Sequence, residues 1–128
     1  MSKKENIAVI LVILATVGTL LAIMGAEKYR IKKKFTVELI ARSPEHGNWY
    51  PQKITVAFGQ EVKILLRNIE TVSHGFALPE FNVAVREIKA GEVKVVEFRA
   101  DKRGVFPFMC TIWCSDNHLQ MRGELFIQ

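Results

Sequence analysis

The sequence has few of the residues that mark several common classes of protein. Of its 128 residues, two are cysteine, eight are glycine and four are proline. Two cysteines are too few for a disulfide-built domain, and so little glycine and proline excludes collagen-like and low-complexity chains. Paired carboxylates, a nucleophile beside a base and a glycine-rich phosphate loop are also missing. We therefore predict no catalytic residues and no substrate pocket within this chain.

Apolar residues are concentrated near the start of the chain. Residues 7–26 (IAVILVILATVGTLLAIMGA) carry no formal charge over 20 positions. A helix rises about 1.5 Å per residue, so roughly 20 residues span a bilayer core of about 30 Å. Lysines precede the run, as in secretory signals, but such signals have an apolar core of about 7–15 residues and an A-x-A cleavage site, which this run lacks. We predict an uncleaved transmembrane helix at about 7–26, within a membrane anchor at 1–34.

The net charge of +5 is also localised. Residues 27–34 (EKYRIKKK) carry five basic side chains and one acidic one, whereas residues 35–128 carry eleven of each sign. The folded part therefore lacks the basic surface that nucleic-acid binding requires, and we expect no nucleic acid as a partner. A basic flank beside an apolar helix suits anionic lipid headgroups. By the positive-inside rule, the same flank favours a cytoplasmic location for residues 35–128.

Beyond residue 34 the pattern is typical of β-strands. Short runs rich in Val, Ile, Phe and Thr alternate with turn residues, and helical periodicity is absent. Seven such runs are typical of an all-β sandwich or Greek-key barrel. We expect an all-β domain at 35–128, preceded by one transmembrane helix. The predicted strands are 35–42, 52–58, 61–67, 81–88, 93–100, 105–110 and 123–127.

One short segment (CTIWCSDNHLQM) contains most of the residues that can bind a metal. Cys110, Cys114, His118 and Met121 are spaced 4, 4 and 3 residues apart, between the last two predicted strands. His74 lies 36 residues before Cys110, on a loop that a sandwich can bring to the same end. Two thiolates, two imidazoles and a thioether are a specific set of soft and borderline donors. Their occurrence together favours a metal site over solvent-exposed histidines and a methionine in the core.

The donor set favours copper over zinc. A Cys₂His₂ site can hold tetrahedral zinc, but zinc leaves Met121 without a role, because thioethers are ligands of copper. A blue copper centre uses one cysteine, and here there are two. Two thiolates can instead bridge two copper ions, each completed by an imidazole and a weak axial donor. The spacing alone also permits a disulfide between Cys110 and Cys114.

The motif C-x-x-x-C-x-x-x-H-x-x-M, with an upstream histidine in the setting VSHGF, resembles the CuA domain of cytochrome c oxidase subunit II. The likeness extends over nearly all of 35–128, including NWYPQKITVAFGQEV and the turn IKAGEV. It implies a cupredoxin fold with a binuclear copper centre, two copper ions per chain. The ligands that it implies are Cys110 and Cys114 as bridges, His74 and Met121 on one copper, and His118 and the main-chain carbonyl of Ile112 on the other.

The resemblance also implies partners and a location. The family's copper centre accepts electrons from a cytochrome c or similar small carrier and passes them to haem in subunit I of a terminal oxidase. The chain would be a subunit of an oxidoreductase complex, without a substrate site of its own. Its single helix resembles the compact subunit II of oxidases related to those of Thermus. That implies a single-pass protein of the cell (inner) membrane, with the copper domain on the periplasmic or outer face, against the charge of the flank.

One departure from the family lies within the motif, and several other functions stay open. Many members have Glu at the position of Ile112, where the carboxylate helps to hold magnesium; the carbonyl role survives the change, but the magnesium role cannot. A stand-alone membrane-anchored CuA-type carrier or a nitric oxide reductase subunit would use the same domain. A Sco-type copper-delivery protein also has one anchor and C-x-x-x-C, but with a thioredoxin-like α/β fold. A structural zinc or disulfide domain is the remaining alternative.

Residues around the motif receive weaker predictions. Trp113, if exposed, is a candidate contact for an electron donor, with ordinary packing as the equal alternative, and Trp49 and Tyr50 have the same two interpretations. His46, in the polar loop SPEHGN, is expected to be solvent-exposed with no partner nearby. Hydrogen bonds from neighbouring side chains should orient both imidazoles. Asp116 and Asn117 are candidates for this role, but the interpretation of both as ordinary turn residues is favoured.

Overall fold

The computed structural model describes residues 2–128. The chain divides into two compact units: the first ends at Lys32, and the second is Lys33–Gln128. The first unit is a single α-helix, α1 (Lys3–Lys32). Because each unit is compact by itself, the two are described separately, and the predicted domain boundary between residues 34 and 35 stays a prediction.

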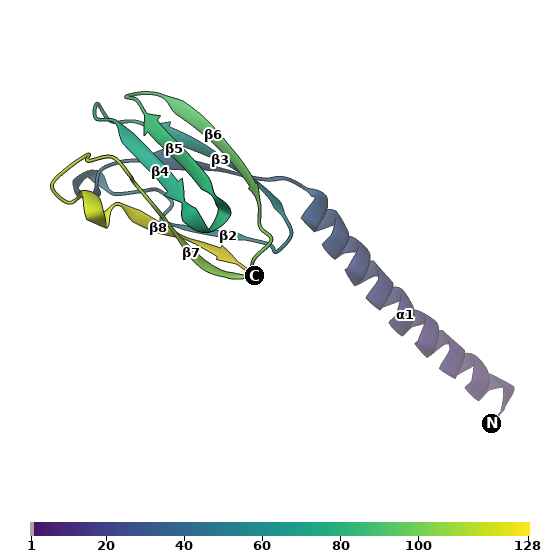
Figure 1. Cartoon of the computed structure of the whole chain (residues 1–128). Coiled ribbons are helices and arrows are strands. Elements are labelled where there is room, and N and C mark those ends of the chain that lie inside the picture. Colours follow the sequence, from purple (N-terminus) through teal and green to yellow (C-terminus); the bar gives the residue numbers. More distant parts are fainter. Residues whose placement is uncertain (1) are drawn as a thin grey trace. The chain divides into compact units, whose positions relative to one another are not determined.

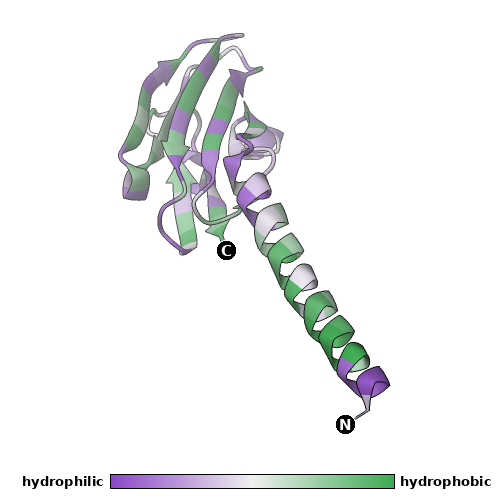
Figure 2. Ribbon diagram, turned by 90° about the vertical axis from the view of Figure 1, so that its right-hand side faces the viewer, coloured by the Kyte–Doolittle hydropathy of each residue, from purple (hydrophilic) through white to green (hydrophobic). Residues whose placement is uncertain are grey.

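Helix α1 is longer than the apolar run that predicted it. It starts with a capping box, in which the Ser2 side chain accepts a hydrogen bond from the Glu5 N–H and the Glu5 carboxylate accepts one from the Ser2 N–H. Its central turns are apolar and its start is hydrophilic, as Figure 2 shows. Among the described residues it is the helix long and apolar enough to cross a membrane. Its exposed apolar side chains, such as Leu14 and Leu21, suit a lipid environment.

The second unit consists of two β-sheets (Figure 1). One sheet has the strand order β1-β3-β6 and the other has the order β2-β8-β7-β4-β5. β1 pairs with β3 in parallel, as does β2 with β8, and the remaining pairs are antiparallel. The predicted all-β class is confirmed. The strands in the described residues are β1 (Phe35–Ala41), β2 (Lys53–Val56), β3 (Glu61–Asn68), β4 (His74–Leu78), β5 (Val83–Ile88), β6 (Val93–Arg99), β7 (Gly104–Met109) and β8 (Arg122–Ile127).

One strand was missing from the sequence prediction, and one was predicted too long. β4 (His74–Leu78) was predicted to be a loop, because the run is short and contains Gly75, a residue that weakens a strand pattern. The strand predicted at 52–58 ends at Val56. Gly59 adopts a φ of 81° in the turn that follows, and Phe58, in that turn, is 39% exposed. The other predicted strands agree with observed ones to within two residues at each end.

The core between the sheets ends in an aromatic cluster beneath the β7–β8 connection. Trp49, Phe76 and Phe108 are buried, with ring centroids 5.7 to 6.1 Å apart. Burying a large apolar side chain contributes about 1.5–3 kcal/mol. Gly123 in β8 permits this packing, because a Cβ there would lie 2.2 Å from Cζ of Phe108. These buried rings adjoin both ends of the segment that contains the cysteines: Phe108 lies two residues before Cys110, and Trp49 donates to the carbonyl of Met121.

Candidate metal centre

The predicted ligands come from two parts of the second unit. His74 is the first residue of β4, and the other five belong to the connection between β7 and β8, residues 110–121. This connection ends in a short 3-10 helix, η3 (His118–Gln120). It lies at the end of the sheets opposite the C-terminus (Figure 1). The fold therefore brings a strand and a loop that are far apart in the sequence to the same place.

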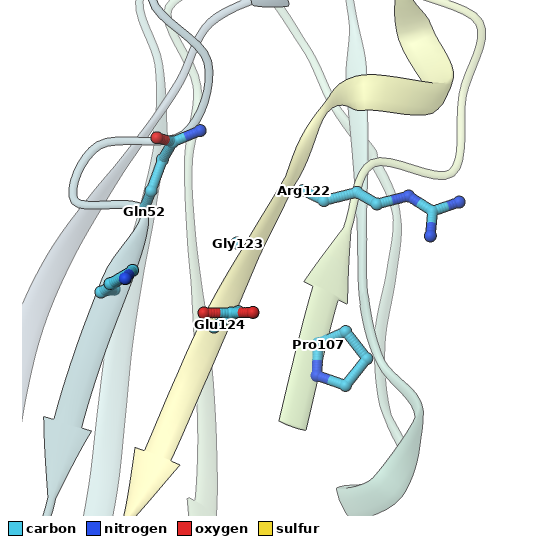
Figure 3. A pocket seen from close by; sticks show the side chains of 6 residues that line it. Gln52, Pro107, Arg122, Gly123 and Glu124 are labelled. Atoms are coloured by element: carbon cyan, nitrogen blue, oxygen red, sulfur yellow. The ribbon is translucent and has the colours of Figure 1, made fainter. Parts of the chain in front are cut away.

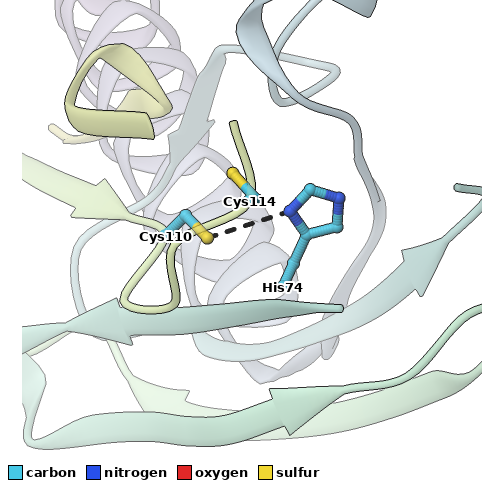
Figure 4. Close-up of side chains that lie close together, drawn as sticks. All are labelled: His74, Cys110 and Cys114. Atoms are coloured by element: carbon cyan, nitrogen blue, oxygen red, sulfur yellow. Dashed lines mark hydrogen bonds between the residues drawn. The ribbon is translucent and has the colours of Figure 1, made fainter. Parts of the chain in front are cut away.

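The first group of donor atoms surrounds the buried sulfur of Cys110. Its Sγ lies 3.8 Å from Nδ1 of His74 and 3.3 Å from the carbonyl oxygen of Ile112. Figure 4 shows the three side chains His74, Cys110 and Cys114 close together, with the contact between Cys110 and the His74 ring marked. The ligand atoms of His74, Cys110 and Cys114 all lie within 4.8 Å of one another. These three side chains are close enough to share a metal site.

The second group surrounds the partly buried sulfur of Cys114. Its Sγ lies 3.6 Å from Nδ1 of His118 and 3.6 Å from Sδ of Met121. Met121 is fully buried, so its thioether is held among core side chains. Both cysteines are free thiols, so the structure does not contain the disulfide that their spacing permits. Each sulfur thus has its own imidazole nitrogen and one further donor.

Gly75 allows the β7–β8 connection to approach β4 directly. A Cβ at this position would lie 2.1 Å from Oγ1 of Thr111 and 3.2 Å from Cγ1 of Ile112. The pairing of β4 with β5 also changes register between His74 and Phe76, on either side of this glycine. Any larger side chain would push the connection away from the strand. The local sequence VSHGF therefore brings Cys110 within reach of His74.

The carbonyl group of Met121 joins the two ends of the connection. It accepts hydrogen bonds from the N–H of Cys110, at 3.0 Å, and from Nε1–H of Trp49, at 3.3 Å. Trp49 is fully buried, so the prediction that it contacts an electron donor at the surface is wrong. Its position in the core gives it a structural role. Its indole N–H ties the core to the backbone of Met121 at the end of the connection.

A carboxylate that the sequence prediction missed holds the other nitrogen of His74. Oε2 of Glu70 lies 2.9 Å from Nε2 of His74, which leaves Nδ1 facing the sulfurs. Ser43 donates to both carboxylate oxygens, from its N–H at 2.8 Å and its Oγ at 3.0 Å. His46 Nδ1 contacts Oε1. The available signal was an acidic residue four positions before the histidine, although this signal alone is weak.

The structure corrects the prediction for His46 and agrees with the turn role favoured for Asp116 and Asn117. The side chain of His46 is 70% exposed, as expected, but it has partners in Glu70 and Ser43. Asn117 donates to Glu45 at 2.6 Å instead of to an imidazole. Asp116 is exposed and has no hydrogen bond to an imidazole among the described residues. Both positions lie in the turn before η3, where their side chains face outward.

The surroundings of the sulfurs make the two thiols different. Burial opposes ionisation of Cys110, but the His74 imidazole and the Gly75 N–H outweigh it and hold the pKa of this thiol below its ordinary value. Burial and the adjacent Cys110 raise the pKa of Cys114 to about 12. Burial disfavours the charged form of His74, yet Cys110 and Glu70 raise its pKa overall. Cys110 therefore loses its proton more readily than Cys114, and a metal held by both sulfurs would have to displace the Cys114 proton.

The exposed side of the cluster contains an aromatic side chain and a groove. Trp113 is 68% exposed, and its ring centroid lies 5.9 Å from that of His118. Tyr50 is 61% exposed. A groove with a volume of about 420 Å³ reaches the β7–β8 connection at Cys114. Its lining residues are Ser43, Glu45, His46, Ile69, Glu70, Thr71, Val72, Cys114 and Ser115.

Another hollow lies on β2, β7 and β8 (Figure 3), and no predicted ligand is among its lining residues. Its volume is about 390 Å³, and its lining contains neither an imidazole nor a sulfur. It offers none of the donors that the copper hypothesis requires. The lining residues are Gln52, Lys53, Pro107, Arg122, Gly123 and Glu124.

Known proteins resemble this chain in sequence and in fold. A nitrous-oxide reductase of Cupriavidus necator is 34% identical over 103 residues, which are 78% of this chain and 15% of that protein. An alternative cytochrome c oxidase subunit 2 of Bradyrhizobium diazoefficiens is 34% identical over 70 residues, 55% of this chain and 24% of that protein. The chain thus spans only a small part of these relatives.

A cryo-electron microscopy structure of a heme-copper terminal oxidase dimer contains a chain of the same fold. The match covers the full length of both chains, with a TM-score of 0.63 and 20% sequence identity. The model of the cupredoxin-like domain family matches residues 9–127. In this fold the His/Cys/Cys cluster supports copper binding. By its two sheets and this match over nearly its whole length, the chain belongs to the cupredoxin-like domain family.

Proposed function

We propose that the chain is a membrane-anchored electron carrier with a binuclear copper centre of the CuA type, serving a terminal oxidase. The observation that carries the proposal is the pairing of each cysteine sulfur with a different imidazole nitrogen, at 3.8 Å for Cys110 and 3.6 Å for Cys114. A blue copper site uses one thiolate. Two sulfurs with separate imidazoles instead supply comparable donors for two ions.

The proposed ligands divide into two sets that share the sulfurs. The carbonyl of Ile112 beside Cys110 and the thioether of Met121 beside Cys114 supply the weak axial donors. Neither donor has a role in a zinc site of the Cys₂His₂ type. Following the family resemblance, Cys110 and Cys114 would be shared by both ions, with His74 and Met121 on one copper and His118 and the carbonyl of Ile112 on the other. The distances in the metal-free chain instead group Ile112 with His74 and Met121 with His118.

The fold restricts the movement of these donor atoms and excludes water from them. A copper pair held by the proposed ligands would supply one-electron transfer. Trp49, Phe76 and Phe108 pack below the loop and exclude water from that side. The hydrogen bond from the Cys110 N–H to Met121 ties both ends of the connection together. Close packing of this kind resists movement of the ligands when the charge changes.

Trp113 is the proposed contact for the electron donor. It is the exposed aromatic residue between the two cysteines, and its ring lies beside that of His118. A donor that covers Trp113 would come close to a ligand without entering the protein. We propose a cytochrome c or another small electron carrier for this role.

The proposed partner in the membrane is the haem-containing subunit I of the oxidase. Sequence identity to an oxidase subunit 2 supports it, as does a match that includes the N-terminal helix. We place the copper domain on the periplasmic or outer face of the cell (inner) membrane, where small electron carriers are found in this family. The basic flank at 28–34 then contacts lipid headgroups or subunit I, although charge alone favours the opposite orientation.

A stand-alone anchored carrier and a nitric oxide reductase subunit with the same domain stay as alternatives, because similarity to nitrous-oxide reductases shows that segments like this one also occur outside oxidases. Co-purification with a haem-containing subunit supports an oxidase or reductase, and a haem-free monomer supports the lone carrier. The Sco-type alternative is wrong, because residues 33–128 form two β-sheets and lack, within the described chain, the α-helices of a thioredoxin-like fold.

The decisive experiment is electron paramagnetic resonance of the copper-loaded full chain in detergent, together with metal analysis. We expect two copper ions per chain and hyperfine coupling to two equivalent copper nuclei. Coupling to one nucleus would indicate blue copper. One zinc ion, or no metal, would contradict the proposed function altogether.

A further inference from the structure

Glu70 is a charged side chain in an unusual place. It lies between β3 and β4, with only 11% of its side chain exposed. Its partners across ion-pair distances are the imidazoles of His74 and His46. A partly buried carboxylate is costly unless its oxygens accept several hydrogen bonds. The carboxylate oxygens of Glu70 meet this requirement through contacts with Ser43, His46 and His74.

Hydrogen bonds of the backbone fix the position of Glu70. Its N–H donates to Oδ1 of Asn68 at 2.8 Å. Asn68 is fully buried, and its Nδ2 donates to the carbonyls of Val72 and Ile88, at 2.7 and 2.9 Å. These bonds fix the turn that leads from β3 into β4. The carboxylate therefore reaches His74 from a rigid position.

The contacts of the carboxylate form a chain from the groove to the predicted ligand. His46 at the surface contacts Oε1, and Ser43 donates to both oxygens. Oε2 lies 2.9 Å from Nε2 of His74, where an ionised carboxylate accepts a hydrogen bond from Nε2–H. An imidazole with its proton on Nε2 presents an unprotonated Nδ1 to a metal.

We propose that Glu70 is a positioning residue that holds the His74 imidazole with Nδ1 toward the sulfurs, and that Ser43 and His46 set how strongly its carboxylate acts on that ring. The reduction potential of the centre then depends on a hydrogen-bond chain that ends at the surface groove. The part concerning potential rests on the proposed copper function, whereas the orientation of His74 does not.

The sign of the effect follows from charge. A carboxylate beside the ring adds negative charge and makes the imidazole a stronger donor, which stabilises the oxidised, more positive centre and lowers its potential. The Ser43 and His46 donors draw electron density away from the same carboxylate. Loss of Glu70 and loss of its donors should therefore shift the potential in opposite directions.

Glu70→Gln and Glu70→Leu separate charge from orientation. Glutamine keeps an acceptor for Nε2–H, so we expect the two-copper spectrum to remain while the potential rises. Leucine removes the acceptor too, so the nitrogen coupling of His74 should also change. Glu87→Gln is the matched control: Glu87 is exposed and accepts from Ser73, next to His74, without touching a predicted ligand. An equal rise in this control, or none in either Glu70 variant, overturns the proposal.

Ser43→Ala and His46→Ala test the outer members of the chain. Each removes one hydrogen bond to the carboxylate and leaves the contact between Glu70 and His74 in place. We expect the potential to fall in both variants, opposite to Glu70→Gln. A rise in both variants would contradict the proposed role of the surface residues.

A measurement on the metal-free full chain tests the orientation independently of copper. Nitrogen-15 NMR of the neutral His74 ring should place its proton on Nε2 in the wild type and in Glu70→Gln, and shift it toward Nδ1 in Glu70→Leu. An unchanged tautomer in Glu70→Leu would overturn the positioning role. If the wild type fails to bind two copper ions, only the proposed function is contradicted, and this measurement still decides the role of Glu70.

Discussion

The two imidazoles of the candidate centre have contrasting surroundings. His74 begins a strand, is fully buried, and has its second nitrogen held by Glu70. His118 lies in η3 on the β7–β8 connection, is partly exposed, and has the ring of Trp113 beside it. One side of the cluster is thus fixed by a sheet and a buried network. The other is fixed by a short loop that reaches the surface.

The contrast separates two requirements of an electron-transfer site. Rigid ligands keep the structure similar before and after transfer, and the His74 side supplies this rigidity. Access for a partner needs exposed surface close to a ligand, and the His118 side supplies it through Trp113. Substitutions on each side should therefore differ in their effects on metal binding, on stability and on electron uptake.

The largest effect is expected from the cysteines, because the proposal makes them common to both sides. Cys114→Ser should abolish the binuclear site, and Cys110→Ser should do the same, as measured by metal analysis and electron paramagnetic resonance. Met121→Leu is the control: it keeps the volume of the buried side chain and should retain two copper ions with an altered spectrum. A delocalised two-copper signal in Cys114→Ser would show that the ligand assignment is wrong.

The next effect compares the stability contributed by each imidazole in the metal-free protein. His74→Ala leaves a cavity and an unpaired, partly buried Glu70, so we expect a loss of about 2–4 kcal/mol in the free energy of unfolding. His118→Ala removes a partly exposed side chain and should cost under about 1 kcal/mol. Denaturant unfolding of the full chain in detergent, followed by tryptophan fluorescence, measures both. Equal losses would remove the proposed difference between the sides.

Copper binding should strengthen as the pH rises, because the thiol on the exposed side must lose its proton. The pKa of Cys114 is about 12 in the metal-free protein, so this thiol is protonated at neutral pH and binding releases its proton. One released proton raises the apparent affinity about tenfold per pH unit below that pKa. Cys110, whose pKa is lowered, contributes over a lower pH range. Calorimetry in buffers of different ionisation enthalpy counts the protons, and a count of zero contradicts the prediction.

The smallest change in stability is expected from Trp113→Ala. The side chain is 68% exposed, so the free energy of unfolding should change by no more than about 0.5 kcal/mol. Electron uptake from a reduced cytochrome c should nevertheless slow, as measured by stopped-flow absorbance. Leu119→Ala is the control, since Leu119 is 72% exposed on the same connection. Equal slowing in both variants would show that apolar surface matters and the indole ring does not.

Much of the fold was predictable because strands with one buried face carry a local pattern. Val62, Ile64 and Leu66 alternate with polar residues along β3, and all three are buried. β4 was missed because Gly75 interrupts its pattern for a reason that is not local. The glycine is required by Thr111, which lies far away in the sequence. A close approach between distant segments leaves no periodic signal in either one.

The sequence by itself determined the apolar helix, the all-β class and the set of donors, because hydrophobic periodicity and the spacing of ligand types are properties of neighbouring residues. Only the tertiary structure decided that Trp49 is buried, that Trp113 is exposed, and that Glu70 holds His74. These facts depend on how segments from different parts of the chain meet at one end of the sheets. The identity of the donors is thus local information, whereas their orientation and accessibility arise from packing.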